Sequence, residues 1–358
     1  NALRRYERFA DVFSLLLGVT GQFLNLLLMA SAIATIGVGL GLAIRAAALR
    51  FAFGPLGGFE SWFLGLFAAL LASALLGLMG FRPSRIAWVL LSASLVICLI
   101  WAVRTKPNVS DIRIRAKDLV RRNHAGLIGG VLLMVPFLPL FRFGPTTWTL
   151  ESNDFTLFSS WLIVWESPSH EDFLHQHPDK WGRETLVGAT IEKPVAIGAL
   201  GLLAAFSFGS ILESQTAVFL IVVTGTYVFL WKACQALVGR VPLWASVGVA
   251  VCTVSLYPWA RVLNTNWGHA VALLALAGAI YWAARNAPSA NRGVRSFIDA
   301  AITGVLIGIG FGANAELVAL LTPTLLAVLV VLYFLRRQAP RLLTVGGWLL
   351  GALLSSSY

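Results

Sequence analysis

Runs of apolar residues close to the length of a membrane span recur along almost the whole chain of 358 residues. About 20 residues of α-helix cover the hydrocarbon core of a bilayer. Backbone polar groups cannot stay unpaired in lipid, so every span must be helical. The sequence therefore predicts an all-α, polytopic transmembrane helical bundle with about 10–11 membrane helices, one of them interfacial. The apolar runs bounded by charge lie at 12–44, 62–81, 87–103, 125–141, 195–211, 217–237, 243–260, 270–284, 298–319, 323–335 and 342–358.

Composition excludes the soluble classes of protein. Hydrophobic residues make up 58% of the chain and charged residues 12%, which is too few charges to cover the surface of a soluble domain of this length. The net charge is +11, but the basic residues gather in short loops between apolar runs. That pattern indicates membrane topology and lipid headgroups as partners, and it does not indicate nucleic acid. Cys98, Cys234 and Cys252 lie in separate apolar segments without CxxC spacing, so no disulfide framework or zinc site is indicated.

Lysine and arginine decide which loops face the cytoplasm. The segment 104–124 contains seven of them, and further basic clusters follow at 232–240, 285–295 and 336–341. The helix at 125–141 then runs outward, so the polar segment after it lies on the extracytoplasmic side. The charge rule holds through the second half only if 195–211 does not cross the bilayer. We therefore expect an interfacial helix there, which lies in the outer leaflet or dips into it.

These signals divide the chain into two parts. Residues 1–124 are expected to form N-terminal transmembrane helices and a basic cytoplasmic loop. Residues 125–358 are expected to form a transmembrane core with an extracytoplasmic loop at 142–215. The run 12–44 is too long for a cleavable signal peptide. The chain begins with Asn and stops inside an apolar run, so we expect a fragment with a truncated C-terminus. We expect the protein to lie in the cell (inner) membrane.

The loop from residue 142 to residue 192 differs chemically from the rest of the chain. It holds half of the sixteen acidic residues and three of the five histidines. Within it, the stretch NDFTLFSSWLIVW at 153–165 has the apolar spacing of a one-faced helix, rich in aromatic residues that suit the headgroup level. Asp154 has two interpretations. Asn153 or Asp154 is the N-cap of this helix, or Asp154 is a partly desolvated carboxylate that acts as a general base.

The order of these features resembles the GT-C superfamily of membrane glycosyltransferases. An acidic motif follows an outward-running helix, then an amphipathic segment, then a Lys-Pro that opens an interfacial helix. The residues that carry the similarity are NDF at 153–155 and IEKPVAIGALGLLAAFSFG at 191–209, and the pattern continues through 257–285. The similarity covers about residues 125 to 358 and is closest to the protein mannosyltransferase and aminoarabinose transferase group. In that group the acidic pair is usually Asp-Glu and the lysine is followed by two prolines. Here Asn153 precedes a single Asp, and Val195 replaces the second proline.

The resemblance implies an enzyme that moves a sugar from a polyprenyl-phosphate donor to a hydroxyl of a lipid, glycan or protein acceptor. It implies Asp154 as the general base, with Asn153 beside it. Lys193 would meet the donor phosphate or, alternatively, a lipid headgroup. Arg261 and His269 would bind phosphate or sugar hydroxyls, or would anchor the chain at the interface.

Two further groups are candidates for binding. Glu316 is an ionisable residue in an apolar run, where such a residue is costly and often functional, so we expect it to face a wet cavity with Asn314. In the loop, His170, Asp172, His175 and His177 are weak metal candidates, because no HExxH spacing is present. No cofactor follows from the sequence with certainty. A divalent cation, Mg²⁺ or Mn²⁺, that assists the phosphate leaving group stays an open alternative.

Two other classes of function fit many of the same features. A transporter or lipid flippase would also have many helices and an intramembrane acid, but its polar residues would gather near the midplane in two repeated halves. A noncatalytic subunit of a membrane complex would use the acidic loop as a docking surface. The concentration of acids in one external loop favours chemistry at the membrane surface.

Overall fold

The computed structural model describes residues 2–50, 56–106, 109–135, 153–191, 193–208, 215–256, 267–286, 294–335 and 342–356. Every regular element in these residues is helical, so the chain is an all-α, multi-pass membrane protein, as predicted. The helices are α1 (Ala2–Arg50), α2 (Gly58–Leu78), α3 (Pro83–Thr105), α4 (Val109–Met134), α6 (Asn153–Glu166), α7 (His170–Gln176), α8 (Lys180–Ile191), α9 (Pro194–Ala204), α10 (Gln215–Val238), α11 (Leu243–Leu256), α13 (Trp267–Asn286), α14 (Val294–Ala313), α15 (Ala315–Leu335) and α16 (Leu342–Ser356).

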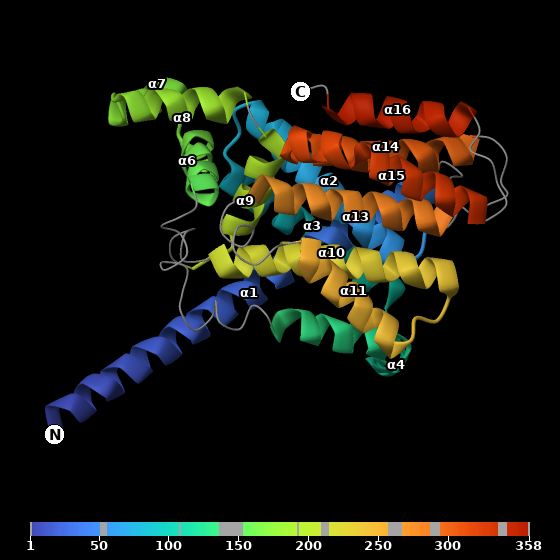
Figure 1. Ribbon diagram of the computed structural model, residues 1–358, viewed down its shortest axis with the longest axis horizontal. Coiled ribbons are helices and arrows are strands. Elements are labelled where there is room, and N and C mark those ends of the chain that lie inside the picture. Colours follow the sequence, from blue (N-terminus) through green and yellow to red (C-terminus); the bar gives the residue numbers. More distant parts are fainter. Residues whose placement is uncertain are drawn as a thin grey trace.

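Most of the long helices run along one direction and form a bundle with two chemically different ends (Figure 1). At one end, here called the basic end, α1, α3, α10, α13 and α15 finish and α2, α4, α11, α14 and α16 begin. At the other, here called the acidic end, α6, α7 and α8 gather. Among the side chains described, the basic end carries Arg45, Arg104, Lys106, Lys117, Arg121, Arg122, Lys232, Arg240 and Arg285 against Glu60, Asp118 and Asp299. The acidic end carries Arg82, Arg85, Lys180, Arg183 and Lys193 against Glu166, Glu171, Asp172, Asp179, Glu184 and Glu316.

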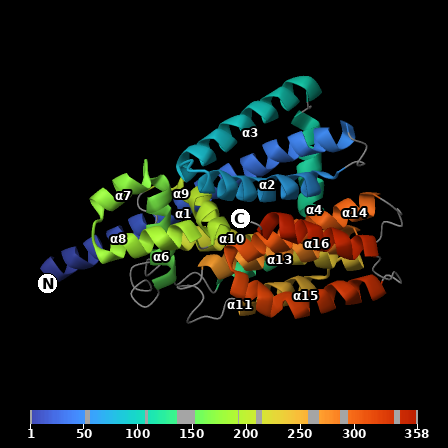
Figure 2. The same cartoon turned by 90° about the horizontal axis from the view of Figure 1, so that it is seen from above.

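Five helices in the described part of the chain are long and apolar enough to cross a membrane: Phe23–Leu49, Gly58–Leu78, Pro83–Thr105, Ala217–Val238 and Trp267–Arg285. Their surroundings differ widely. In α13 the most apolar window is 89% buried, whereas in α3 it is 17% buried. The exposed side of α3 includes Trp88, Val89 and Leu99, an apolar surface that only lipid can cover at low cost. Figure 2 shows α3 along one side of the bundle and α15 on the opposite side.

Two features at the centre hold the helices together. Aromatic rings from α2, α10 and α13 interlock, with Phe63 stacked on Trp282 at 5.7 Å between centroids and edge-on to Phe229 at 5.0 Å. The second feature is close backbone contact between α1 and α2. A Cβ atom added at Gly65 would lie 2.3 Å from the carbonyl oxygen of Gly37, so the two helices touch through glycine, as membrane helices commonly do.

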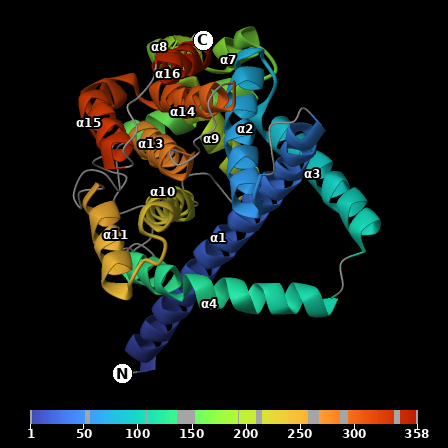
Figure 3. The ribbon, with the colours of Figure 1, turned by 90° about the vertical axis from the view of Figure 1, so that its right-hand side faces the viewer.

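The helix α4 is placed differently from the spans. Figure 3, viewed along the bundle, shows α4 extended across it while α10, α13 and α14 appear foreshortened. Its exposed face mixes Ile114, Leu119 and Val120 with Lys117 and Arg121. That mixture is typical of a helix at the bilayer interface, whereas the sequence predicted a basic loop over 104–124.

The structure differs from the prediction in two places. The predicted spans 298–319 and 323–335 are divided instead at Asn314, where α14 ends and α15 begins, and Pro323 lies inside α15. The predicted interfacial helix at 195–211 is α9, which has 11 residues and is too short to cross a bilayer. Its residues Val195–Leu203 are buried, and it packs against α2, α3 and α6. α9 is therefore enclosed by protein, which contradicts a helix lying on the outer leaflet with one face in lipid and leaves the alternative that it dips into that leaflet.

Candidate functional site

Lys193 occupies a sharp bend at the acidic end of the bundle. It is the residue before Pro194, which opens α9, and its backbone is left-handed, with φ 49° and ψ 49°. The axes of α8 and α9 on its two sides differ by 100°. A left-handed backbone costs a residue with a Cβ about 1–2 kcal/mol. Such strain is concentrated at functional sites, where the surrounding structure enforces it.

The Lys193 ammonium lies over an aromatic ring of α6 that packs against the start of α13. Its Nζ is 5.7 Å from the centroid of Phe158 in α6. A Cβ added at Gly268 in α13 would lie 3.2 Å from that same ring and 3.6 Å from Nδ2 of Asn314. We call Phe158, Lys193, Gly268, His269 and Asn314 the acidic-end cluster. In the described part of the chain, no carboxylate lies within ion-pair distance of Lys193.

The cluster is positioned by hydrogen bonds between side chains and the backbone at the starts of α13 and α15. Trp267 is fully buried and donates from Nε1 to the carbonyl oxygen of Ala196, at 2.7 Å, which ties the start of α13 to α9. The side chain of Asn314 accepts from the N–H of Leu317 at 2.8 Å and so caps α15. Its Nδ2 lies 3.4 Å from Nδ1 of His269. One imidazole and one amide are therefore held side by side.

Glu316 lies beside this pair in the sequence but not inside a span. It is exposed and sits in the first turn of α15, where the helix dipole favours a negative charge. The sequence places Glu316 in an apolar run near its external end, and the break at Asn314 puts it at the start of α15. Its proximity to Asn314 along the chain is as predicted.

Three predicted site residues lie wholly or partly outside the described structure. Asp154 and Asn153 form the first turn of α6, one helical turn before Phe158, and their side chains lie outside the described set. Because α6 begins at Asn153, both residues lie within its first turn. An acid at that position benefits from the helix dipole. Arg261 lies outside the described residues.

The loop histidines are separated from one another. Ser169 caps α7 by accepting from the N–H of Asp172 and also donates to its carboxylate at 2.8 Å. His177 packs between Phe173 and Trp181, with centroid distances of 4.9 and 5.4 Å, and His175 is exposed. His170 lines a polar pocket of about 400 Å³ with Ser167, Ser169 and the turn at Met79 and Gly80. No three His, Cys, Asp or Glu side chains converge on a metal position in the residues described.

Glu166 helps to hold α6 in place at the acidic end, a role that was not predicted from the sequence. Its carboxylate accepts from the backbone N–H and from the hydroxyl of Ser84, both at 2.6 Å. This contact joins the end of α6 to the first turn of α3 and fixes α6 across the acidic end. The available signal was a Pro-Ser helix start at 83–84, which leaves orphan N–H groups for a carboxylate to bind.

Comparisons with protein-family models, with curated proteins and with solved structures give no match to this chain. The chemistry of the site is therefore the guide to function. The acidic-end cluster offers a cation without a carboxylate partner among the described residues, an imidazole and an amide. Such a set can bind an anionic group and the hydroxyls next to it.

Proposed function

We propose that the chain is a membrane glycosyltransferase of the GT-C type. It transfers a sugar from a polyprenyl-phosphate donor to a hydroxyl of a lipid, glycan or protein acceptor, on the extracytoplasmic face of the cell (inner) membrane. Asp154 is the general base. The observation that carries the proposal is Lys193, an ammonium on a strained bend over the Phe158 ring, which in turn packs against the start of α13 next to His269 and Asn314.

The orientation is supported by the distribution of charge between the two ends. Nine basic side chains oppose three acidic ones at the basic end, among those described, and five oppose six at the acidic end. Lys and Arg are retained on the cytoplasmic side of membrane proteins. This supports an orientation with the basic end in the cytoplasm and α6, α7 and α8 outside.

The proposed step breaks the bond between the anomeric carbon of the sugar and a phosphate oxygen of the donor. The phosphate leaves with the bonding electron pair, and Lys193 stabilises the charge that develops on it. The acceptor oxygen forms the new bond to the anomeric carbon, and Asp154 takes the hydroxyl proton. His269 and Asn314 hydrogen-bond sugar hydroxyls. A divalent cation, Mg²⁺ or Mn²⁺, is the alternative partner of the phosphate.

The direct test uses the purified chain in lipid vesicles with a panel of radiolabelled polyprenyl-phosphate sugars. Membrane extract is added to the vesicles as the source of acceptors. The proposal expects label from at least one donor to move to a lipid, glycan or protein acceptor in that extract. Parallel reactions with EDTA distinguish Lys193 alone from a required divalent cation. If every label stays on its donor while the protein remains folded, the chain is not this transferase, and the transporter and subunit alternatives take its place.

The backbone of Lys193 allows the role of its charge to be separated from structure. Lys193→Gly removes the ammonium but favours the left-handed backbone, so the free energy of unfolding should stay equal or rise by up to about 1 kcal/mol. Transfer should fall about tenfold or more, because a charged hydrogen-bond donor to the phosphate is lost. Initial rates and thermal unfolding in detergent measure the two effects.

The chain contains a matched control for that variant. Lys106, at the end of α3 and at the basic end, also has a left-handed backbone, with φ 40°. Lys106→Gly should affect stability in the same direction and leave transfer unchanged. Equal activity of the two variants would remove Lys193 from the reaction.

A further inference from the structure

An apolar cavity of about 370 Å³ lies inside the bundle, between α1, α2, α9, α10 and α13. Its walls include Ala30 from α1, Trp62 from α2, Leu202 from α9, Val228 from α10 and Leu274 from α13. The cavity is partly open to the outside of the bundle, and its lining is almost wholly apolar. It has the size of a ligand site, and it lies along helices that span the hydrocarbon.

A lysine lies about one helical turn beyond the last residue of α10 that lines this cavity. Lys232 belongs to α10, and its Nζ lies 5.2 Å from the ring centroid of Phe59 and 4.8 Å from that of Trp231. The ammonium donates to Oδ1 of Asn123 at 3.2 Å and to Oε1 of Gln235 at 2.8 Å. Both partners are neutral amides, so two hydrogen bonds hold the lysine in place without neutralising its charge.

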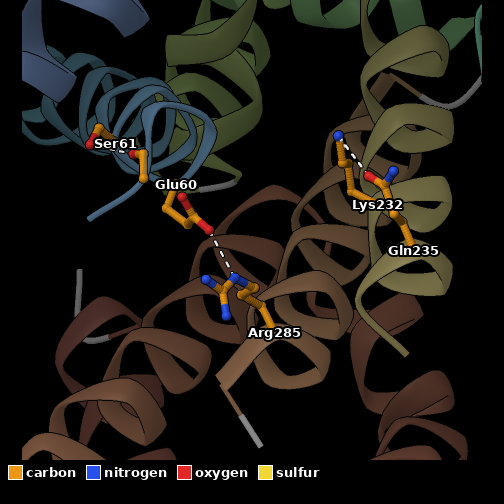
Figure 4. A network of polar contacts seen from close by, with 6 residues as sticks. Glu60, Ser61, Lys232, Gln235 and Arg285 are labelled. Carbon is orange, nitrogen blue, oxygen red and sulfur yellow. Dashed lines mark hydrogen bonds and ion pairs between the residues drawn. The ribbon is translucent and has the colours of Figure 1, made fainter. Parts of the chain in front are cut away.

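The neighbouring carboxylate, Glu60, already forms an ion pair with another residue. Glu60, in the first turn of α2, accepts from Nε of Arg285 at 2.8 Å. Figure 4 shows this pair and the Lys232–Gln235 pair as two separate contacts. No carboxylate among the described residues lies within ion-pair distance of Lys232. With Glu60 opposed by Arg285, the group of three charges keeps a net positive charge.

The lining of the cavity comes within about one helical turn of Lys232. Val228 lines the cavity and lies four residues, about 6 Å along the helix, before Lys232. On the facing helix, Trp62 lines the cavity and its ring centroid lies 5.5 Å from that of Phe59, the ring beneath the ammonium. An amphiphile with its tail in the cavity would therefore bring its headgroup to Lys232.

We infer that this is a binding site for an anionic membrane lipid whose headgroup lies toward the basic end and whose acyl chain reaches past the middle of the bundle. An acyl chain occupies the cavity between α1 and α10, and the phosphate of the headgroup lies at Lys232. The occupant is a lipid because the cavity lies along membrane-spanning helices, where acyl chains surround the protein. It is anionic because no carboxylate of the described structure lies within ion-pair distance of the ammonium, Glu60 is paired with Arg285, and basic residues predominate at that end. The inference does not depend on the proposed transferase activity.

The headgroup half of the site is tested with Lys232→Met, which keeps an apolar stem over Phe59 and Trp231 and removes the charge. The purified full chain is titrated with dioleoylphosphatidylglycerol and, separately, with dioleoylphosphatidylcholine, and bound lipid is counted by native mass spectrometry. Lys232→Met should weaken binding of phosphatidylglycerol about fivefold and leave phosphatidylcholine unchanged. Lys117→Met, an exposed lysine at the same end, is the matched control and should bind as the wild type does.

The tail half of the site is tested with Ala30→Phe, which fills the cavity from α1. Bound phosphatidylglycerol should be lost, whereas Ala93→Phe on the exposed side of α3 should change nothing. Thermal unfolding shows that each variant is folded. Three results would each overturn the site: equal losses in Lys232→Met and Lys117→Met, no preference of the wild type for phosphatidylglycerol, or full binding by a folded Ala30→Phe variant.

Discussion

Asp154→Asn should lower sugar transfer about 10²- to 10⁴-fold, the range that a general base contributes. The asparagine cannot accept the acceptor's proton, so the attacking oxygen must lose it to water. Asparagine and aspartate have similar helix propensities, so the first turn of α6 should persist. The loss of the dipole interaction should reduce the free energy of unfolding by at most about 1 kcal/mol. Initial rates on the donor that the vesicle panel identifies, with thermal unfolding in detergent, measure both quantities.

Glu171→Gln is the matched control for that variant. Glu171 is an exposed acid in the first turn of α7, at the same end of the bundle, and losing its charge changes the acidic loop by the same amount. Transfer should stay within about twofold of the wild type, since electrostatic effects at exposed sites are small. Transfer by Asp154→Asn at the wild-type rate would assign the acid a structural role in α6. Equal losses in both variants would point to the charge of the whole loop.

Hydropathy predicted several spans well, and failed at others. The predictions at 62–81, 87–103 and 217–237 correspond to α2, α3 and α10 within a few residues. It failed at Asn314, because the apolar run continues on both sides of that residue. Asn314 ends α14 by capping α15 through its own side chain, a local hydrogen bond that no average over a window detects. Pro323 misled in the opposite direction, since α15 continues through it, as membrane helices can.

The site was predicted in part, and for a different reason. Lys193 and His269 were chosen through the resemblance, at the start of the expected interfacial helix and at the expected external tip, and the structure puts both at the acidic end. Phe158 and Gly268 were missed because what joins them is contact between α6 and α13. An aromatic residue in an amphipathic stretch looks like any other buried ring. The one local sign was Gly268 between Trp267 and His269, where the absence of a side chain lets the Phe158 ring approach.

Gly65→Ala should destabilise the protein by about 1–3 kcal/mol, the range for overpacking a tight contact. Its new Cβ would lie 2.3 Å from the carbonyl oxygen of Gly37 and 2.6 Å from the backbone nitrogen of Gly41. Both neighbours are backbone atoms of α1, so no side chain can rotate away and the two helices must separate. Thermal unfolding in detergent, followed by near-ultraviolet circular dichroism of the tryptophans, should show a lower midpoint than the wild type.

Gly248→Ala makes the same chemical change in α11, where nothing lies within 4 Å of the new Cβ. Alanine favours a helix over glycine by up to about 1 kcal/mol, so this variant should match or exceed the wild type in stability. The two substitutions should therefore have opposite signs, because only the first meets a neighbouring helix. If Gly65→Ala unfolds at the same midpoint as Gly248→Ala, the close approach of α1 to α2 is absent. The wall that α1 contributes to the lipid cavity would then have to be placed elsewhere.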